Sequence, residues 1–409
     1  MRKRGIAPAV AALAAYMALL PACGQSAAAP DLDTGAFQAE VSAITVPDSV
    51  RVVGLGEASH GAGELQQLKA EVFKALVQNN GCRVFAIEGD FGGCAKVDEY
   101  IHGGAGTAAE AVGEIGFRIY RTQELADLAE WMRTYNESAA PGQDLHFLGF
   151  DMQRYDHSKA RLLSFLQQAA PALAAAYEPK LAPLTDAAMY DLKEETLAGA
   201  EADLTALLAA MPTQITVRDG DYAFALQCAQ SMLENTQLRR SSAQYNALRD
   251  AAMKKKVDWI CAQYDGLIFI NGHNGHIAKQ SASNYDCMGA GLETAYAEGY
   301  FAIGTDVAAC SFNGQNGDGY EVFTVKHEDA LTAQLAALPE NCYYLDFARV
   351  DGDPAWQEVL NAPQAMLALN VSFAPWQKLF QPMYTLSVVP QQSYDAMLLL
   401  KATTPTRLL

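Results

Sequence analysis

The chain is short of basic residues, and this shortage bears on the partners it can have. Its 409 residues include 29 Lys and Arg against 47 Asp and Glu, which gives a formal net charge of −18. Nucleic acids and anionic membrane surfaces attract basic patches, so an acidic balance argues against both. We therefore expect no nucleic-acid partner.

Motifs that mark common catalytic and metal-binding sites are also missing. The eight cysteines include no closely spaced pair of the kind that binds zinc. No serine lies in a Gly-x-Ser-x-Gly elbow, which weakens a mechanism through an acyl-enzyme. Export would permit disulfides between Cys82 and Cys94 or between Cys287 and Cys310, but the sequence leaves the pairing open.

A long apolar run occurs only near the N-terminus. Arg2, Lys3 and Arg4 precede the run at 6–20, which is short for a membrane-spanning helix. The following residues resemble a bacterial lipoprotein cleavage box with Cys23 as the lipidated residue. Ordinary signal cleavage near the same place is the alternative. We predict a signal peptide over 1–23, a tether over 24–35, export, and membrane attachment only through a lipid on Cys23.

The remainder, 36–409, alternates strand-like and helix-like segments. Apolar runs at 52–55, 84–87, 145–150 and 267–270 are typical of buried parallel strands, and shorter candidates follow at 301–305, 320–325, 342–345, 384–389 and 396–400. Helices are expected at 33–46, after Gly61 as far as a C-cap at Gly81, at 123–135 after the N-cap Thr122, and near 277–290. From about 157 to 263 glycine is scarce, and alanine and leucine dominate. We predict an α/β fold with a three-layer α/β/α core, a largely parallel sheet and an inserted helical subdomain at about 157–263.

Acids and imidazoles follow three of these strands. Glu57 and His60 end the first, Glu88 ends the second, and His273 and His276 lie in a Gly-flanked turn after the run at 267–270. Open α/β sheets place their ligands at the carboxyl ends of the strands. Since three of only seven histidines occur here, we predict that these five residues form one catalytic site.

Such a group of residues suits hydrolysis by an activated water. A carboxylate beside His60 would favour the correct tautomer and stabilise the imidazolium, so that His60 could act as a general base. His273 or His276 could polarise a carbonyl or protonate the leaving alkoxide. Taken singly, a glutamate at a strand end can simply cap the next helix.

The same five residues could instead bind a metal, since two Glu and three His are ordinary ligands for zinc or iron. The spacing of His273 and His276 lacks the helical i, i+4 pattern of zinc proteases, and the intervening Gly275 indicates a turn. We favour a hydrolase without metal or cofactor. The alternative is a surface-tethered protein that binds a metal, haem or small ligand in the same cleft.

A series of sequence blocks resembles the erythromycin esterase family, in family order. The blocks lie at 54–61, 85–88, 121–124, 131–136, 149–153, 249–253 with Trp259, and 273–276, with a weaker echo at 394–396. The resemblance implies a three-layer α/β core and a metal-independent hydrolase that opens a macrolide lactone with water. By position, the essential histidine is His60, supported by Glu57 and Glu88, with His273 and His276 across the cleft.

The resemblance also suggests substrate-binding residues, and at one of them this chain differs from the family. These residues are Lys69, Arg121 and Asp151. Lys69 stands where the esterases carry an arginine, and the two are not equivalent for bidentate contacts. An exported form would be a further departure from the cytoplasmic resistance enzymes. We therefore expect a small-molecule carboxylic ester as substrate, with a macrolide lactone as one candidate.

Overall fold

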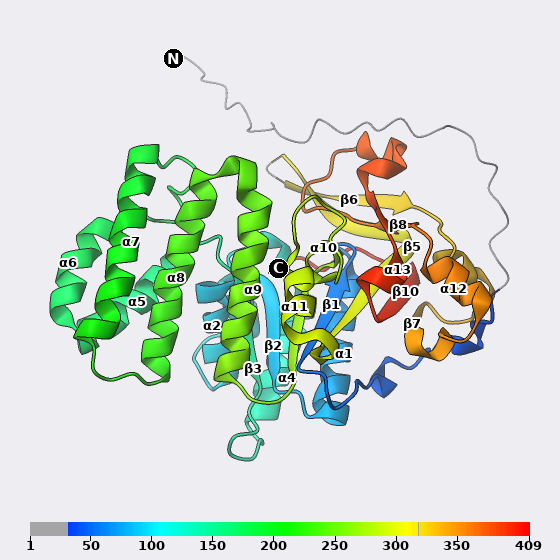
Figure 1. The fold of residues 1–409 in the computed structure, drawn as a ribbon, viewed down its shortest axis with the longest axis horizontal. Coiled ribbons are helices and arrows are strands. Elements are labelled where there is room, and N and C mark those ends of the chain that lie inside the picture. The colour runs from blue at the N-terminus through cyan, green and yellow to red at the C-terminus, as the bar shows by residue number, and fades with distance from the viewer. Residues whose placement is uncertain (1–31, 318) are drawn as a thin grey trace.

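A mixed, mostly parallel sheet forms the centre of the protein (Figure 1). The computed structural model describes residues 32–317 and 319–409, so the predicted signal peptide, Cys23 and most of the tether lie outside the described residues. The strand order is β3-β2-β4-β1-β5-β10-β7, with β6 paired to β5. The pairs from β3 to β10 are parallel, and β7 and β6 pair antiparallel. The strands are β1 Val52–Glu57, β2 Val84–Asp90, β3 His146–Asp151, β4 Ile268–His273, β5 Tyr300–Asn316, β6 Gly319–Lys326, β7 Cys342–Asp346 and β10 Ala396–Ala402.

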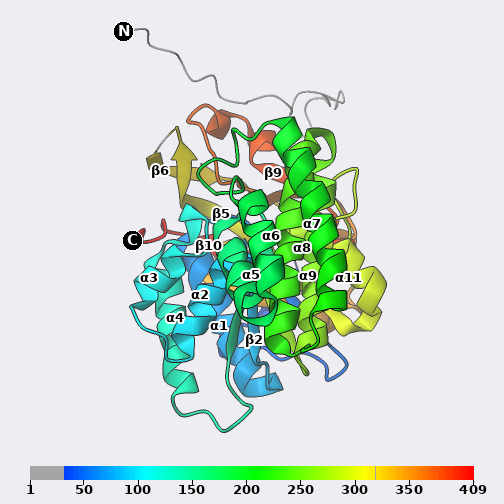
Figure 2. The same cartoon turned by 90° about the vertical axis from the view of Figure 1, so that its left-hand side faces the viewer.

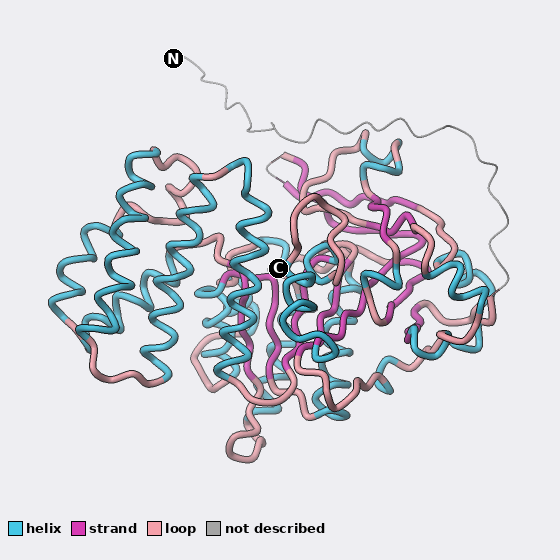
Figure 3. Tube along the Cα trace, in the orientation of Figure 1, coloured by secondary structure: helices cyan, strands magenta, loops and turns pink. Residues whose placement is uncertain are grey.

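Helices cover both faces of this sheet and complete the predicted three layers (Figure 3). On one face, Phe85 and Phe269 pack with residues of α1, α2, α3 and α4. On the other face, Ile268 and Ile270 pack with residues of α9 and α11. These helices are α1 Gly63–Asn80, α2 Phe91–Ile101, α3 Ala108–Gly113, α4 Gln123–Asn136, α9 Tyr245–Gln263 and α11 Met288–Tyr296. The strands are therefore buried on both sides, which explains their continuous apolar runs.

Four helices between β3 and α9 form a separate block at one end of the molecule (Figures 1 and 2). They are α5 Asp156–Ala169, α6 Pro171–Leu181, α7 Glu194–Gln214 and α8 Gly220–Arg240. The block has an apolar core of its own, which includes Leu162, Leu204 and Met232. The block is held against the core at both of its ends: α5 contacts α2, and α9, which follows α8 after one short 3-10 turn, packs on the sheet.

The predicted helix ends at Gly81 and Thr122 are confirmed. Gly81 has φ 67° at the C-cap of α1, a left-handed conformation that suits glycine. The hydroxyl of Thr122 accepts a hydrogen bond from the Leu125 amide at the start of α4. A capping residue acts within one turn of its own helix, so the helix end that it predicts does not depend on the packing of neighbouring elements.

Other local predictions were wrong. Residues 33–46 form two 3-10 turns, Thr34–Ala36 and Val41–Ala43, in place of a helix. The helix expected at 277–290 is split into α10 Asn274–Ile277 and α11, because the intervening segment is rich in Ser and Asn, which favour turns. The strand expected at 301–305, by contrast, is confirmed, and it forms the first part of the longer β5.

The C-terminal part adds elements that the sequence pattern only partly indicated. β8 Gln364–Leu367 and β9 Thr385–Val388 form a separate antiparallel pair, and the short helices α12 Pro354–Leu360 and α13 Pro390–Ser393 lie near it in sequence. The seven cysteines between Cys82 and Cys342 are all free, so neither suggested disulfide is present. Within the described ranges, no helix has the length and apolar character needed to cross a membrane.

Candidate active site

The carboxyl ends of β1, β2 and β4 meet at one edge of the sheet. Glu57 lies opposite His273 in the register of β1 and β4, and Glu88 follows the last paired residue of β2 beside β4. The segment after β4 packs closely on β1, and this requires glycine at position 56, where a Cβ would lie 3.0 Å from the Cα of Asn274. The parallel topology therefore brings together residues that are about two hundred positions apart in sequence.

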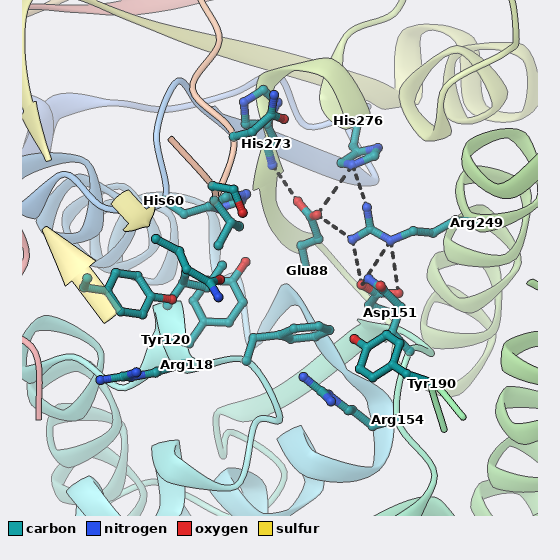
Figure 4. A pocket seen from close by; sticks show the side chains of 18 residues that line it. His60, Glu88, Arg118, Tyr120, Asp151, Arg154, Tyr190, Arg249, His273 and His276 are labelled. Carbon is teal, nitrogen blue, oxygen red and sulfur yellow. Dashed lines mark hydrogen bonds and ion pairs between the residues drawn. The ribbon is translucent and has the colours of Figure 1, made fainter. Parts of the chain in front are cut away.

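A cavity of about 590 Å³ opens at this edge (Figure 4). It is lined by His60, Glu88, Phe117, Arg118, Ile119, Tyr120, Asp151, Gln153, Arg154, Tyr190, Arg249, His273, His276, Gln315, Tyr320, Asn370, Val371 and Ser372. Of the residues predicted from sequence, the cavity thus contains the three histidines, Glu88 and Asp151. Glu57 and Lys69 lie behind its wall, and Arg121 is exposed and does not line it.

His60 is fixed by a buried carboxylate that also contacts a buried ammonium. Its Nδ1 lies 2.6 Å from Oε1 of Glu57, and the Nζ of Lys69 lies 2.8 Å from Oε2 of the same carboxylate. Burial opposes ionisation of Glu57, but Lys69 and His60 outweigh it and lower the pKa of this carboxyl. We assign the His60 proton to Nδ1, since an ionised carboxylate accepts it there. This tautomer leaves Nε2 as the basic nitrogen.

His273 lies beside His60, with 5.5 Å between the ring centroids. Its Nδ1 accepts a hydrogen bond from the Gly275 amide at 3.3 Å, so we assign the ring proton to Nε2. Nε2 is buried and has no hydrogen-bond partner among the described residues. Burial, together with the nearby His60, lowers the pKa of His273 to about 3. His273 is therefore a neutral N–H donor at physiological pH.

Glu88 and Asp151 are joined by one guanidinium on the far side of the cavity (Figure 4). Nη2 of Arg249 lies 2.6 Å from Oε1 of Glu88 and 2.6 Å from Oδ2 of Asp151. The main-chain N–H of His273 donates to Oε2 of Glu88 at 2.7 Å. Burial opposes ionisation of Glu88, but the cationic groups of His276 and Arg249 and this N–H outweigh it and lower its pKa. Glu88 is therefore an ionised carboxylate that orients the turn carrying His273.

His276 is held on the opposite side of Glu88. Its Nδ1 lies 2.7 Å from Oδ1 of Asp250, and its Nε2 lies 3.4 Å from Oε1 of Glu88. Burial favours the neutral ring, but the carboxylates of Glu88 and Asp250 outweigh it and raise the pKa of His276. The two histidines of the turn thus differ: His273 is neutral, and His276 is drawn toward the charged form.

The residues of this site that were not predicted from sequence include Tyr120, Arg249 and Asp250. Tyr120 lines the cavity with a buried hydroxyl that has no partner in the described part of the chain. It comes from a 3-10 turn, Arg118–Tyr120, which carries no periodic signal. Arg249 and Asp250 come from α9, and the sequence block that contains them was the one signal that could have identified them.

Groups that could hold a metal ion lie elsewhere in the described structure. Asp98, His102 and His146 form one such group, and Asp306, His327 and Asp329 form another, each with ligand atoms within 4.8 Å of one another. The cavity carboxylates of Glu88 and Asp151 already face Arg249, and Glu57 behind the wall faces Lys69. A metal there would have to displace these cations.

The comparison that decides the family is a match to the model described as erythromycin esterase, over residues 77–403. The chain belongs to the erythromycin esterase family. The matched range includes Glu88, Asp151, Arg249, His273 and His276, and begins after β1. Membership supports a hydrolytic enzyme of the ester-cleaving type.

Named relatives agree with this assignment over part of the chain. Erythromycin esterase type II of Escherichia coli is 34% identical over 104 residues, which are 25% of this chain and 24% of that protein. Putative hydrolase YbfO of Bacillus subtilis (strain 168) is 29% identical over 108 residues, 26% of this chain and 23% of that protein. The matched segments span only about a quarter of the curated relatives.

Solved structures share the fold over most of the chain. A protein from Bacillus cereus has a TM-score of 0.77 at 21% identity and covers 88% of this chain and 90% of its own. A variant of the erythromycin esterase EreC in its open conformation has a TM-score of 0.67 at 17% identity, over 88% of this chain and 93% of its own. At these identities the likeness shows the fold alone.

Proposed function

We propose that this member of the family hydrolyses a carboxylic ester with a water activated by His60, without a metal. The observation that carries the proposal is the pairing of His60 with an ionised Glu57 at 2.6 Å, beside the neutral N–H donor of His273. A general base and an electrophilic donor on one cavity wall are what water attack on a carbonyl requires.

In the first step, Nε2 of His60 takes a proton from water as the oxygen attacks the ester carbonyl. Glu57 acts as a positioning residue, since it holds the tautomer and stabilises the imidazolium that forms. Negative charge then develops on the carbonyl oxygen. The N–H of His273 supports this charge, and the Tyr120 hydroxyl is a second donor within the cavity.

In the second step, the tetrahedral intermediate collapses. The imidazolium of His60 returns its proton to the leaving alkoxide, and the acid and alcohol are released. His276 lines the same cavity, and Glu88 and Asp250 raise its pKa against the effects of burial and of Arg249. Glu88, Arg249 and Asp151 hold the turn and the opposite wall in place.

The metal- or haem-binding alternative is less well supported. Family membership favours hydrolysis, and the cavity carboxylates face cations that would repel a metal ion. Elemental analysis and an absorption spectrum of the purified protein separate the two functions. A stoichiometric metal whose removal by a chelator abolishes function, or a haem absorption band in the purified protein, would contradict our proposal.

A direct test is to incubate the full-length protein with erythromycin and with simple esters, and to look for the mass of one added water. Erythromycin is the first macrolide to try because relatives carry its name. Turnover of simple esters without turnover of erythromycin would keep the chemistry and discard the macrolide substrate. If no ester is hydrolysed, the proposal fails.

We also propose that the chain is exported and anchored by a lipid on Cys23, with a small-molecule ester as its partner. The support is the basic segment, apolar run and cleavage-box residues of positions 2–23. Mass spectrometry of the N-terminal peptide from membranes tests this. A diacylglycerol-modified Cys23 is expected, and an unmodified terminus after ordinary cleavage would contradict it.

A further inference from the structure

Arg154 is a cation on the cavity wall without an acidic partner. Its Nη1 contacts the sulfur of Met189 at 3.8 Å, and its guanidinium carbon lies 5.3 Å from the ring centre of Phe117. Its Nε is buried without a hydrogen-bond partner, and its side chain forms no ion pair with any residue that the structure describes. In a chain with 47 acidic and 29 basic residues, an unpaired arginine beside the cavity needs an explanation.

The acids near Arg154 are directed elsewhere. Asp151 is paired with Arg249. Asp90 accepts the main-chain N–H groups of Gly93 and Arg154, at 2.9 Å and 3.2 Å, and burial raises its pKa to about 7. Asp186 accepts the main-chain N–H of Tyr155. None of these carboxylates forms an ion pair with the guanidinium of Arg154 in the described structure.

The chain holds this guanidinium in a defined place. Gly116 has φ 93°, and a Cβ there would lie 2.9 Å from the Cγ of Arg154, so the loop packs directly on the arginine stem. The Phe117 ring then covers one face of the guanidinium, a contact that favours Arg over Lys. Figure 4 shows Arg154 across the cavity from His273. A planar donor that is fixed and unpaired is suited to bidentate binding of an oxyanion.

We propose that Arg154 binds an anionic group of the substrate, a carboxylate or a phosphate, while His60 attacks an ester bond elsewhere in the same molecule. This inference rests on the proposed ester hydrolysis and names its substrate class: acidic esters. The cavity then offers a reacting end at His60 and His273 and a recognition end at Arg154. A macrolide with a protonated amino sugar would be disfavoured at the recognition end, because it carries charge of the same sign as the guanidinium.

The kinetic test uses mono-4-nitrophenyl esters of succinic, glutaric and adipic acid. Each is compared with the 4-nitrophenyl ester of a neutral acyl chain of similar length. The parent should show a higher kcat/KM for at least one acidic ester, and Arg154→Gln should lower that value by about tenfold to a hundredfold, as expected for a charge-assisted hydrogen bond. Activity on the neutral esters should change little. Equal preference for charged and neutral esters in the parent, or a preference that survives in Arg154→Gln, overturns the inference.

Two further variants test whether the preference depends on the guanidinium of Arg154 itself. Arg154→Lys keeps the charge but not the planar fork, so it should retain only part of the preference. Arg161→Gln is the matched control: Arg161 is on α5, pairs with Asp221 at 2.7 Å and does not line the cavity. It should leave the preference unchanged.

A binding measurement keeps the inference independent of turnover. Calorimetric titration of the parent with glutarate, adipate or inorganic phosphate should show binding that Arg154→Gln abolishes, and the probe that binds distinguishes a carboxylate from a phosphate. Binding that depends on Arg154 without hydrolysis of any ester would support the anion site and refute the proposed function. Hydrolysis without charge preference or anion binding would refute the anion site alone.

Discussion

The ammonium of Lys69 lies 2.8 Å from Oε2 of Glu57, and both side chains are completely or almost completely buried. The other carboxylate oxygen of Glu57 contacts His60. Lys69 was predicted to bind substrate, but the structure places it behind Glu57 and outside the cavity lining. Because Lys69 contacts Glu57 and does not line the cavity, we interpret it as a positioning residue.

Replacement of Lys69 by Met should destabilise the protein by about 3–5 kcal/mol, because it leaves a buried carboxylate without its cation. Activity should also fall, since the pKa of Glu57 would rise and its hold on the His60 proton would weaken. Urea unfolding and kcat/KM measure the two effects. Lys96→Met is the control: Lys96 pairs with Glu99 on the surface, and its loss should cost less than about 1 kcal/mol.

The double variant Glu57→Gln with Lys69→Met distinguishes the two roles of this pair. Removing both charges should restore much of the stability lost in Lys69→Met, since no buried charge is left unpaired. Activity should stay low because His60 has lost its carboxylate. Recovery of activity together with stability would show that Glu57 has only a structural role.

Replacement of Tyr120 by Phe should lower activity without lowering stability. The hydroxyl is buried and unpaired in the described structure, so its removal should be neutral or stabilising. If it supports the developing oxyanion, kcat should fall by about tenfold or more. Tyr155→Phe gives the opposite pattern, because that hydroxyl lies 3.1 Å from Thr236 and outside the cavity lining: stability should fall and kcat should not.

His273 should make the fold sensitive to mild acid. Its folded pKa is about 3, below the ordinary value of 6.5, so the unfolded chain binds the proton first. Above pH 6.5 the ring is neutral in both states, so the pKa difference does not change the free energy of unfolding. Below pH 6.5 that free energy decreases, and the decrease grows as the pH falls toward 3. His273→Gln should abolish this decrease, so the free energy of unfolding of the variant should exceed that of the parent by on the order of 1 kcal/mol more for each pH unit below 6.5. Urea midpoints of the parent and variant across this range test it, and parallel curves would contradict it.

The sequence predicted the parts of the site that are attached to strand ends. Buried strands end at Glu57, Glu88 and His273. Parallel pairing brings these strand ends to one edge of the sheet, and this does not depend on the conformation of the loops. The α/β class was predicted for the same reason, since apolar runs and helical stripes are local signals. These features depend on few other parts of the chain.

The residues that close the cavity could not be predicted in this way. Tyr120 and Arg154 come from irregular segments, and their positions depend on how loops pack. Arg249 is on a helix whose pattern does not reveal which face meets the cavity. Arg121 is an example: it belongs to the resembling block, but its side chain is exposed and outside the cavity lining, whereas its neighbours Tyr120 and Arg118 line the cavity.

The most direct test of the account is the rate of ester hydrolysis by His60→Ala, with the urea midpoint as a control for folding. We predict that kcat/KM falls by about a hundredfold to ten-thousandfold, the usual contribution of a general base. Free imidazole should restore part of the lost rate, because the space left by the side chain admits it. A folded His60→Ala protein that hydrolyses esters as fast as the parent would contradict the central claim.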